Sequence, residues 1–344
     1  MAVLVTGGAG YIGSHMVWEL LDDSQDVVVL DRLSTGFDWA VPQEAKLVVG
    51  DVGDTQLVRS VIRENGIDAV IHFAGSIVVP ESIADPLGYY ENNTSKTRNL
   101  IEAVVREGVS HIIFSSTAAV YGEPGVKPVH ENDLLAPQTP YGLSKLMSEW
   151  ILRDASHAHD FTYTALRYFN VAGADPRGRT GQSTPGATHL LKVACETALG
   201  KRAFMQVFGA DYPTPDGTGI RDFIHVSDLA AAHRLALARL RAGEGSLVAN
   251  CGYGHGHSVL ELIDSVKRVS ARDFEVKLAP RRPGDLASVI ADSSLARREL
   301  GWSSRYDHLD TIVETALRWE SQLARKNSTS APRRRLTLSD AVSA

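Results

Sequence analysis

The chain has little cysteine, no long apolar run and no excess of basic residues. Its two cysteines, Cys195 and Cys251, are too few for a disulfide framework and do not stand in a metal-ligand spacing, so we expect a reducing compartment and no bound metal. No apolar stretch reaches the roughly 18 residues that span a membrane, and the first residues lack the charged and apolar regions of a signal peptide. A net charge of -6 provides no basic patch for nucleic acid. These absences predict a cytoplasmic protein that binds neither membranes nor nucleic acid.

The first half of the chain alternates regularly between apolar runs and helical patterns. Strands are predicted at 2–6, 27–30, 47–49, 69–73, 111–115 and 162–167, and helices at 12–22, 54–65, 87–107 and 141–158. Because the runs are uninterrupted and rich in β-branched residues, each strand is expected to be buried on both faces. The pattern predicts an α/β fold of the Rossmann type, a doubly wound parallel sheet with helices on both sides.

The character of the sequence changes near residue 173, where glycine, proline and threonine become frequent and the alternation is lost. We expect residues 1–172 to form a dinucleotide-binding Rossmann domain, to which some later segments can return. Residues 173–326 are expected to form a smaller mixed lobe, with ligand binding between the two units. Residues 327–344 are rich in serine, threonine and arginine without an apolar stripe, and we expect a disordered tail there.

A glycine-rich turn separates the first predicted strand from the first predicted helix. Gly7, Gly10 and Gly13 allow a tight turn, close approach of the backbone to a pyrophosphate and close packing of the helix. The pyrophosphate would lie at the helix N-terminus, where free N–H groups point at it. Asp31 ends the second strand 18 residues after Gly13, where a carboxylate binds the adenosine ribose of NAD and repels the extra phosphate of NADP. The two features predict bound NAD, although Arg32 could weaken the repulsion.

Two further patterns place catalytic groups near the same sheet. Tyr141 and Lys145 are spaced i, i+4 and therefore share one face of a helix. The lysine can hold the nicotinamide ribose and lower the pKa of the tyrosine by its charge, which makes the tyrosine a base for a substrate hydroxyl. Thr117 follows the strand at 111–115, and its hydroxyl can share a proton with Tyr141. Each pattern alone has a plain alternative, an exposed helix face or a turn hydroxyl bonded to its own backbone.

These motifs in this order resemble the extended short-chain dehydrogenase/reductase superfamily. Further segments narrow the resemblance to the UDP-glucose 4-epimerase family over residues 2 to about 320; they are 72–75, 89–93, 166–170, 207–212, 216–226 and 280–285. The residues that match NAD contacts of that family are Gly7, Gly10, Tyr11, Ile12, Gly13, Asp31, Asp51, Val52, Phe73, Ala74, Gly75, Asn92, Tyr141, Lys145 and Phe169. The residues that match UDP-sugar contacts are Thr117, Asn170, His189, Leu190, Phe208, Arg221, Arg282, Asp285 and Val289.

The resemblance also implies a reaction, the reversible 4-epimerisation of UDP-glucose and UDP-galactose through a 4-keto intermediate with transient reduction of NAD. Tyr141 is implied as the base, with Thr117 and Lys145 as its catalytic partners. A homodimer that pairs through the helices 87–107 and 141–158 is implied as well. Val289 stands where a tyrosine fills the space beside the sugar C2 substituent in some relatives, so UDP-GlcNAc and UDP-GalNAc are expected as further substrates.

Three other functions are associated with parts of this pattern. A nucleotide-sugar 4,6-dehydratase needs acidic residues after the strand hydroxyl, but Thr117 is followed by Ala118 and Ala119, which cannot transfer protons. A UDP-pentose 4-epimerase for UDP-xylose or UDP-arabinose would use the same catalytic residues and stays open. A non-catalytic NAD-binding regulator would be expected to lack the group formed by Tyr141, Lys145 and Thr117.

Overall fold

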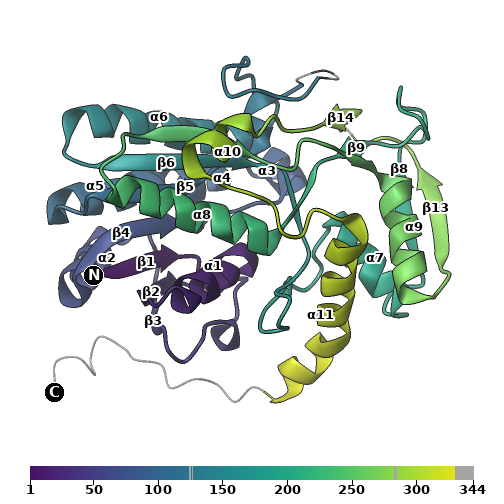
Figure 1. The fold of residues 1–344 in the computed structure, drawn as a ribbon, viewed down its shortest axis with the longest axis horizontal. Helices are drawn as coiled ribbons and strands as arrows, with labels where there is room; N and C mark the ends of the chain where they lie inside the picture. Colours follow the sequence, from purple (N-terminus) through teal and green to yellow (C-terminus); the bar gives the residue numbers. More distant parts are fainter. Residues whose placement is uncertain (124, 126, 283–284, 330–344) are drawn as a thin grey trace.

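The centre of the molecule is a sheet of seven strands in the order β11-β6-β5-β4-β1-β2-β3 (Figure 1). The computed structural model describes residues 1–123, 125, 127–282 and 285–329. The strands are β1 (Ala2–Thr6), β2 (Asp26–Asp31), β3 (Lys46–Val49), β4 (Ile67–His72), β5 (His111–Ser115), β6 (Thr162–Tyr168) and β11 (Leu247–Cys251). Every pair of neighbours runs parallel. The doubly wound parallel sheet predicted from the apolar runs is therefore confirmed.

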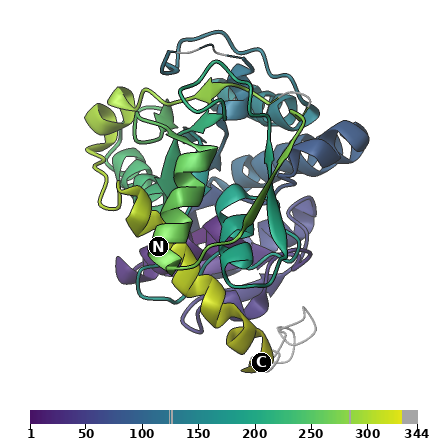
Figure 2. The same cartoon turned by 90° about the vertical axis from the view of Figure 1, so that its right-hand side faces the viewer.

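Helices cover both faces of this sheet (Figures 1 and 2). One face carries α1 (Tyr11–Asp22) and α8 (Val226–Arg241), and the other carries α2 (Thr55–Asn65), α5 (Lys96–Glu107) and α6 (Pro140–Ala158). Successive residues of β1 show the division, because Val3 and Val5 pack in the core on the α1 side whereas Leu4 packs in the core on the α5 side. A strand buried on both faces needs apolar residues at every position, which explains the uninterrupted runs.

The helix expected over 87–107 is continuous but irregular. It consists of α4 (Pro86–Tyr89), a π-helical segment η2 (Tyr90–Ser95) and α5. Asn93 in the π-helical segment is buried, and its backbone carbonyl accepts hydrogen bonds from Thr97 at 2.5 Å and from Ser148 at 3.2 Å. Because π-helical turns often lie at functional sites, this irregularity marks the region next to the loop after β4.

Most of the chain after residue 173 forms smaller sheets and helices beside the main sheet (Figure 1). β7 (Asn170–Ala172) pairs with β10 (Phe223–His225), β8 (Phe204–Phe208) with β13 (Glu275–Ala279), and β9 (Ile220–Arg221) with β12 (His257–Ser258) and β14 (Ser288–Val289). The remaining helices are α3 (Val79–Ala84), α7 (Leu190–Ala198), α9 (Val259–Ser270), α10 (Ser294–Leu300), α11 (Leu309–Thr329) and the short turns η1 (Asp38–Ala40) and η3 (Ala118–Tyr121). α7, α9 and α11 pack against one another at the far end of this region.

Two later segments, α8 and β11, are part of the main sheet and its covering layer. β11 pairs with β6 from Leu247 opposite Thr164 to Cys251 opposite Tyr168. α8 packs against α1 and against β5 and β6. The chain therefore crosses between the sheet and the smaller elements more than once after residue 173.

The C-terminal helix α11 extends further than the sequence pattern indicated. Buried apolar side chains such as Ile312, Val313 and Trp319 anchor it to the protein, and a helix that has been nucleated extends readily beyond its packed part. The disordered tail expected at 327–344 is therefore wrong for residues 327–329, which are helical. Residues 330–344 lie outside the described residues. Within the described chain, no helix is both long enough and apolar enough to cross a membrane.

Candidate active site

The glycine-rich turn between β1 and α1 leaves almost no space for side chains. Gly7 has a φ of +71°, and a Cβ on it would lie 2.7 Å from the backbone N of Ala74. A Cβ on Gly13 would lie 2.1 Å from the carbonyl oxygen of Gly7. Gly10 is the N-cap of α1, and no side chain caps the free N–H groups there. The turn thus offers an open helix N-terminus on which a pyrophosphate fits.

The residues that follow the turn tie it to the segment after β7. The Tyr11 hydroxyl donates to the carbonyl oxygen of Gly173 at 2.6 Å, and the Ser14 hydroxyl lies 2.7 Å from that of Thr180. Ile12 packs against the main core. The segment 173–180 therefore crosses the start of α1 and helps to hold the turn in place.

Asp31 lies at the end of β2 and is directed at the glycine turn. Its carboxylate accepts hydrogen bonds from the N–H groups of Ala9 at 3.0 Å and of Leu33 at 2.8 Å. Burial raises the pKa of Asp31, although both hydrogen bonds and the charge of Arg32 oppose this effect. The carboxylate is held where the adenosine ribose of a dinucleotide lies in this fold.

Asp51, just beyond β3, lies between two cations. Its Oδ2 is 2.5 Å from Lys96 Nζ and 3.7 Å from Arg32 Nη1. Burial favours a raised pKa for Asp51, but the hydrogen bond from Lys96 and its charge lower the pKa overall. Val52 beside it is buried. The sequence did not point to Lys96, because a lysine on an amphipathic helix gives no local sign that it will reach a strand end 45 residues away.

A cavity of about 570 Å³ opens beside this cluster. Its lining includes Arg32 from the end of β2, Ser76 from the loop after β4, and Tyr89, Asn92 and Lys96 from the helix at 86–107. The Asn92 side chain donates to the Ser76 hydroxyl at 2.8 Å. The cavity thus adjoins the residues expected to bind the cofactor.

Asn93 organises the loop that follows β4. Its Oδ1 accepts from the Ser76 N–H at 2.7 Å, and its Nδ2 donates to the Ser76 carbonyl at 3.0 Å and to the Ser144 hydroxyl at 3.1 Å. A Cβ on Gly75 would lie 3.0 Å from Asn93 Oδ1 and 3.7 Å from Lys145 Nζ, so the loop passes close to both. Both Asn92 and Asn93 therefore contact Ser76, and the sequence pattern predicted only Asn92, because nothing in the local spacing shows that a π-helical turn brings the next residue to the loop as well.

Two residues at the start of that loop, Phe73 and Ala74, are packed against other elements. The Phe73 N–H donates to the Thr6 carbonyl at 3.0 Å, and its ring lies 4.9 Å from the His233 ring. Ala74 meets the glycine turn at Gly7. The end of β4 is therefore fixed between the turn after β1 and helix α8.

Tyr141 and Lys145 lie one turn apart on α6, and both are buried. The helix begins with Thr139 as N-cap, whose hydroxyl accepts a backbone hydrogen bond. Lys145 Nζ donates to the Ser115 carbonyl at 3.0 Å. The Thr117 hydroxyl accepts the Ala119 N–H at 3.2 Å and lies close enough to Tyr141 to lower the pKa of that tyrosine in part. The fold thus brings Tyr141, Lys145 and Thr117 together at the carboxyl end of the sheet, where ligands bind in this architecture.

The ionisation of Tyr141 differs from the expectation. Burial raises its pKa, and the hydrogen bond with Thr117 lowers it only in part. The pKa of Lys145 is lowered to about 8, because the effect of burial exceeds the opposing effect of the Glu149 charge. The predicted lowering of the Tyr141 pKa is therefore wrong for this structure, because desolvation of the phenolate outweighs the favourable interactions.

Several residues that match UDP-sugar contacts gather around the sheet of β12, β9 and β14. Arg221 of β9 and Val289 of β14 are register partners, and Arg221 Nη2 lies 3.4 Å from Asp285 Oδ1. The guanidinium carbon of Arg282 lies 3.7 Å from the centroid of the Phe208 ring. Planar guanidinium groups of this kind suit a diphosphate, to which they can donate in pairs.

Val289 and Phe169 belong to one apolar cluster beside α6. Its other members are Val120, Tyr121, Val129, Leu146, Ala291, Ala118 and Leu135. Leu146 follows Lys145 directly on α6, so the cluster adjoins the helix that carries Tyr141 and Lys145. Val289 is only half-buried, which leaves part of its side chain accessible.

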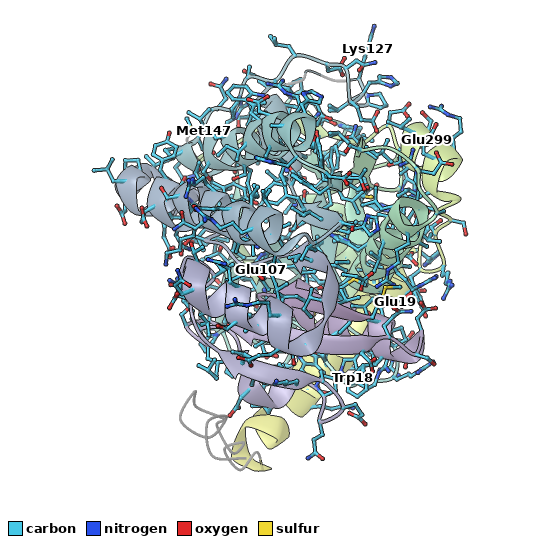
Figure 3. The ribbon with its side chains drawn as sticks, turned by 90° about the vertical axis from the view of Figure 1, so that its left-hand side faces the viewer. Trp18, Glu19, Glu107, Lys127, Met147 and Glu299 are labelled. Atoms are coloured by element: carbon cyan, nitrogen blue, oxygen red, sulfur yellow. The ribbon has the colours of Figure 1, made fainter. Side chains whose placement is uncertain are left out.

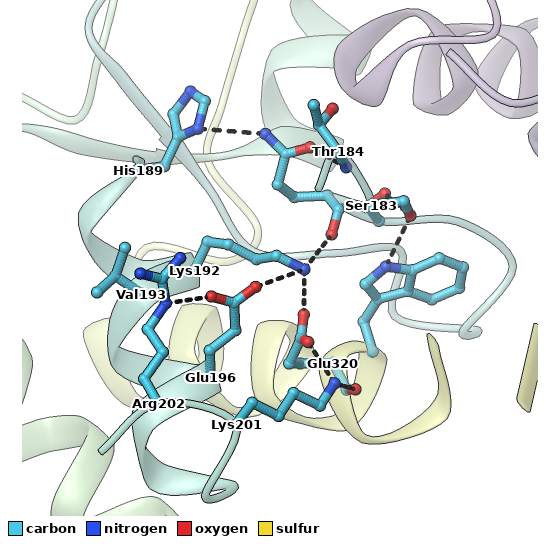
Figure 4. A network of polar contacts seen from close by, with 12 residues as sticks. Ser183, Thr184, His189, Lys192, Val193, Glu196, Lys201, Arg202 and Glu320 are labelled. Carbon is cyan, nitrogen blue, oxygen red and sulfur yellow. Dashed lines mark hydrogen bonds and ion pairs between the residues drawn. The ribbon is translucent and has the colours of Figure 1, made fainter. Parts of the chain in front are cut away.

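Three further residues match UDP-sugar contacts of the related family; they are Asn170, His189 and Leu190. Asn170 is exposed, and its N–H donates to the Asp222 carbonyl at 3.0 Å. His189 is the N-cap of α7, and its Nδ1 lies 3.2 Å from the side-chain nitrogen of Gln182 (Figure 4). Leu190 packs against the main core. The structure therefore orients His189 through Gln182.

A buried polar network holds the start of α7 against α11 (Figure 4). Lys192 Nζ donates to the Gln182 carbonyl at 3.2 Å and forms an ion pair with Glu320. Lys201 pairs with the other oxygen of Glu320 at 2.5 Å, and Arg202 pairs with Glu196. The network therefore fixes the loop before His189 to the C-terminal helix.

Comparison with known proteins gives consistent results. The family model described as "NAD dependent epimerase/dehydratase family" matches residues 3–252. The chain is similar to the UDP-glucose 4-epimerase of Azospirillum brasilense, with 54% identity over 321 residues that cover 93% of this chain and 92% of that protein. It is similar to the structure of the UDP-Glc/GlcNAc 4-epimerase of Campylobacter jejuni, with 49% identity, a TM-score of 0.82, and coverage of 93% and 99%. It is also similar to UDP-glucose 4-epimerase of Bifidobacterium longum solved with NAD+ and UDP, with 40% identity, a TM-score of 0.89, and coverage of 94% and 98%.

Proposed function

The chain belongs to the NAD-dependent epimerase/dehydratase family, and from this membership we propose that it interconverts UDP-glucose and UDP-galactose by inverting C4 of the sugar. The observation that carries the proposal is the pair of buried side chains Tyr141 and Lys145 on one face of α6, where Lys145 Nζ lies 3.0 Å from the Ser115 carbonyl at the carboxyl end of β5. Ala118 and Ala119 follow Thr117, so the position at which a dehydratase needs an acid holds only methyl groups. The site is therefore equipped to move one hydroxyl proton and not to eliminate water.

NAD fits the site because its pyrophosphate can lie on the open N-terminus of α1, close to a backbone that no side chain obstructs. When bound, NAD supplies the oxidation and the reduction at the sugar C4. We assign the cofactor to residues 1–172. The holding residues are Gly7, Gly10, Tyr11, Ile12, Gly13, Asp31, Asp51, Val52, Phe73, Ala74, Gly75, Asn92, Tyr141, Lys145 and Phe169. Asn93 is buried and positions the loop that contains Gly75.

In this proposal Tyr141 accepts the proton of the sugar 4-hydroxyl and returns a proton to the 4-keto oxygen after the sugar has turned over. Burial makes a bare Tyr141 phenolate unfavourable, so the nearby hydrogen bond from Thr117 and the ammonium of Lys145 must stabilise it when it forms. Lys145 also holds the nicotinamide ribose. Catalysis thus depends on Lys145 being charged.

Residues 173–326 are proposed to anchor the UDP moiety while the sugar turns. Arg221 and Arg282 would donate to the diphosphate, and Asp285 orients Arg221. The remaining contacts are assigned to Asn170, His189, Leu190, Phe208, Thr117 and Val289. Val289 leaves space beside the sugar C2 substituent, so UDP-GlcNAc and UDP-GalNAc are proposed as additional substrates.

A homodimer is proposed to form through the surface of α4, α5 and α6. Figure 3 shows the side of the molecule on which α5 and α6 lie, with Glu107 and Met147 labelled. Trp150, three residues after Met147 on α6, keeps 42% of its surface exposed and would supply buried aromatic area to such an interface. A monomeric Trp150→Glu variant in light scattering would support this surface, and a wild type that is monomeric at assay concentration would contradict it.

Both cysteines are free and buried, which supports a reducing cytoplasm.

The deciding experiment is product analysis after incubation with UDP-galactose, UDP-GalNAc, UDP-xylose and UDP-arabinose. The proposal requires UDP-glucose from UDP-galactose, with NAD found in the purified protein. Turnover of the pentoses alone would favour a UDP-pentose 4-epimerase, which uses the same catalytic residues. Recovery of every sugar unchanged would favour a non-catalytic NAD-binding regulator.

A further inference from the structure

Helix α6 holds three consecutive residues at the end of β5. The contacts are Lys145 Nζ to the Ser115 carbonyl at 3.0 Å, the Ser116 hydroxyl to Glu149 Oε1, and the side chain of Thr117 to that of Tyr141. Tyr141, Lys145 and Glu149 are four residues apart and therefore share one face of the helix. The contacts of Lys145 and Glu149 therefore hold the two residues just before Thr117 against α6.

Glu149 is buried and is itself firmly held. Arg167 of β6 donates to both of its oxygens, from Nη2 to Oε2 at 2.6 Å and from Nε to Oε1 at 3.0 Å. Arg167 also donates to the Tyr121 hydroxyl at 2.9 Å and to the Glu131 carbonyl at 3.2 Å. A carboxylate fixed on two sides in this way can position Ser116 accurately.

The titratable groups around Lys145 come from three elements. His72 of β4 faces it, Tyr141 and Glu149 lie one turn away on its own helix, and β6 contributes Arg167 behind Glu149 and Tyr168 beside Ser115. Glu149 is the group whose charge favours the ammonium form of Lys145. Burial favours the neutral amine, so the negative charge of Glu149 opposes burial directly.

We propose that Glu149 is a positioning residue for the epimerase reaction: its carboxylate holds Ser116 at the end of β5 and supplies the negative charge that the buried Lys145 ammonium requires. The inference rests on the proposed function, since it gives Lys145 and Tyr141 their roles. Glu149 should therefore have two separable effects. One is on the position of Ser116 at the end of β5, and the other is on the charge of Lys145.

Three variants separate these effects in the NAD-loaded protein. Glu149→Gln removes the negative charge. The alkaline limb of the pH profile of kcat with UDP-galactose should then shift to lower pH by about one unit or more, because Lys145 loses its proton more readily. Glu149→Asp keeps the charge and should restore the limb to its wild-type position. Ser116→Ala removes only the hydrogen bond and should lower kcat by about tenfold without moving the limb. KM for UDP-galactose should stay within about threefold in all three, since Glu149 and Ser116 are placed behind the site.

The proposal is overturned if Glu149→Gln leaves the alkaline limb unchanged or if Ser116→Ala moves it equally. Because loss of one partner of a buried ion pair strongly destabilises proteins, Glu149→Gln is first checked for its circular dichroism spectrum and NAD content. If that variant does not fold, wild-type kcat in Ser116→Ala or a shifted limb in Glu149→Asp refutes the proposal.

A substrate-free titration separates this inference from the proposed function. The Lys145 signal, followed by NMR with ¹³C-labelled lysine and assigned with Lys145→Met, should titrate at lower pH in Glu149→Gln than in wild type. A wild type without epimerase activity but with this shift would refute the proposed function and support the electrostatic link. Equal titration in both proteins would refute the link, whatever the activity.

Discussion

Replacing Val289 by tyrosine should exclude N-acetylated sugars from the substrate range proposed for this protein. Val289 is half-buried in β14, is the register partner of Arg221, and packs in a cluster with Phe169 and Leu146. Tyrosine would extend an aromatic ring and a hydroxyl from this position into the space proposed for the C2 substituent. The change should therefore act on N-acetylated sugars and leave the 4-hydroxyl chemistry at Tyr141 intact.

The expected size of the effect follows from packing. Forcing a bulky group into a filled pocket costs about 1–3 kcal/mol, and each 1.4 kcal/mol corresponds to about a factor of ten in kcat/KM. The ratio of kcat/KM for UDP-GalNAc to that for UDP-galactose should thus fall by about tenfold or more in Val289→Tyr. Because Val289 is only half-buried and the cluster it packs against is apolar, the variant is expected to fold.

The assay compares wild type, Val289→Tyr and Val289→Phe with both sugar pairs. The phenylalanine variant has the ring without the hydroxyl, so a similar loss there would assign the effect to volume. Val289→Ile adds only one methylene and serves as the matched control, with a ratio near that of wild type. An unchanged ratio in Val289→Tyr, or a wild type inactive on N-acetylated sugars, would refute the reasoning.

Three other predictions concern the cofactor, the base and acid stability. Tyr141→Phe should keep the fold and NAD but lose about 10²–10⁴ in kcat; near-wild-type turnover would remove Tyr141 from the base role. Asp31→Ala should relax the preference for NAD over NADP, measured as the ratio of Kd values; a wild type that binds both equally would contradict this role of the carboxylate. His72 is buried between Thr6 and Thr97, and burial lowers its pKa from 6.5 to about 3. Unfolded His72 takes up a proton below pH 6.5 while folded His72 does not, so this group should remove up to about 1.4 kcal/mol of unfolding free energy per pH unit between pH 6 and 4. Urea unfolding at several pH values should show a slope that is smaller by about one proton in His72→Asn, and equal slopes would show that His72 does not contribute.

The order of apolar runs was sufficient to predict the central architecture. The strands predicted at 2–6 and 111–115 have the bounds of β1 and β5, and the helix predicted at 141–158 differs from α6 by one residue. Local periodicity succeeds there because a strand buried on both faces and an amphipathic helix each need their own spacing of apolar residues. The predicted helix over 87–107 has the right extent, but its π-helical turn depends on contacts of Asn93 with Ser76 and with Ser144, 51 residues away.

The sequence by itself determined the parallel sheet, the glycine turn after its first strand, and the placement of Tyr141 and Lys145 on one face of a helix. Each of these features depends on residues that are close together in the chain. Only the tertiary structure decided that Lys96 reaches Asp51 and that Arg167 of β6 holds Glu149. It also decided the direction of the Tyr141 pKa, which rises although a lysine stands one turn away. The physical reason is that desolvation and ion pairing depend on every group packed around a side chain, and those groups come from strands whose order in the sheet is not written in the spacing of any single motif.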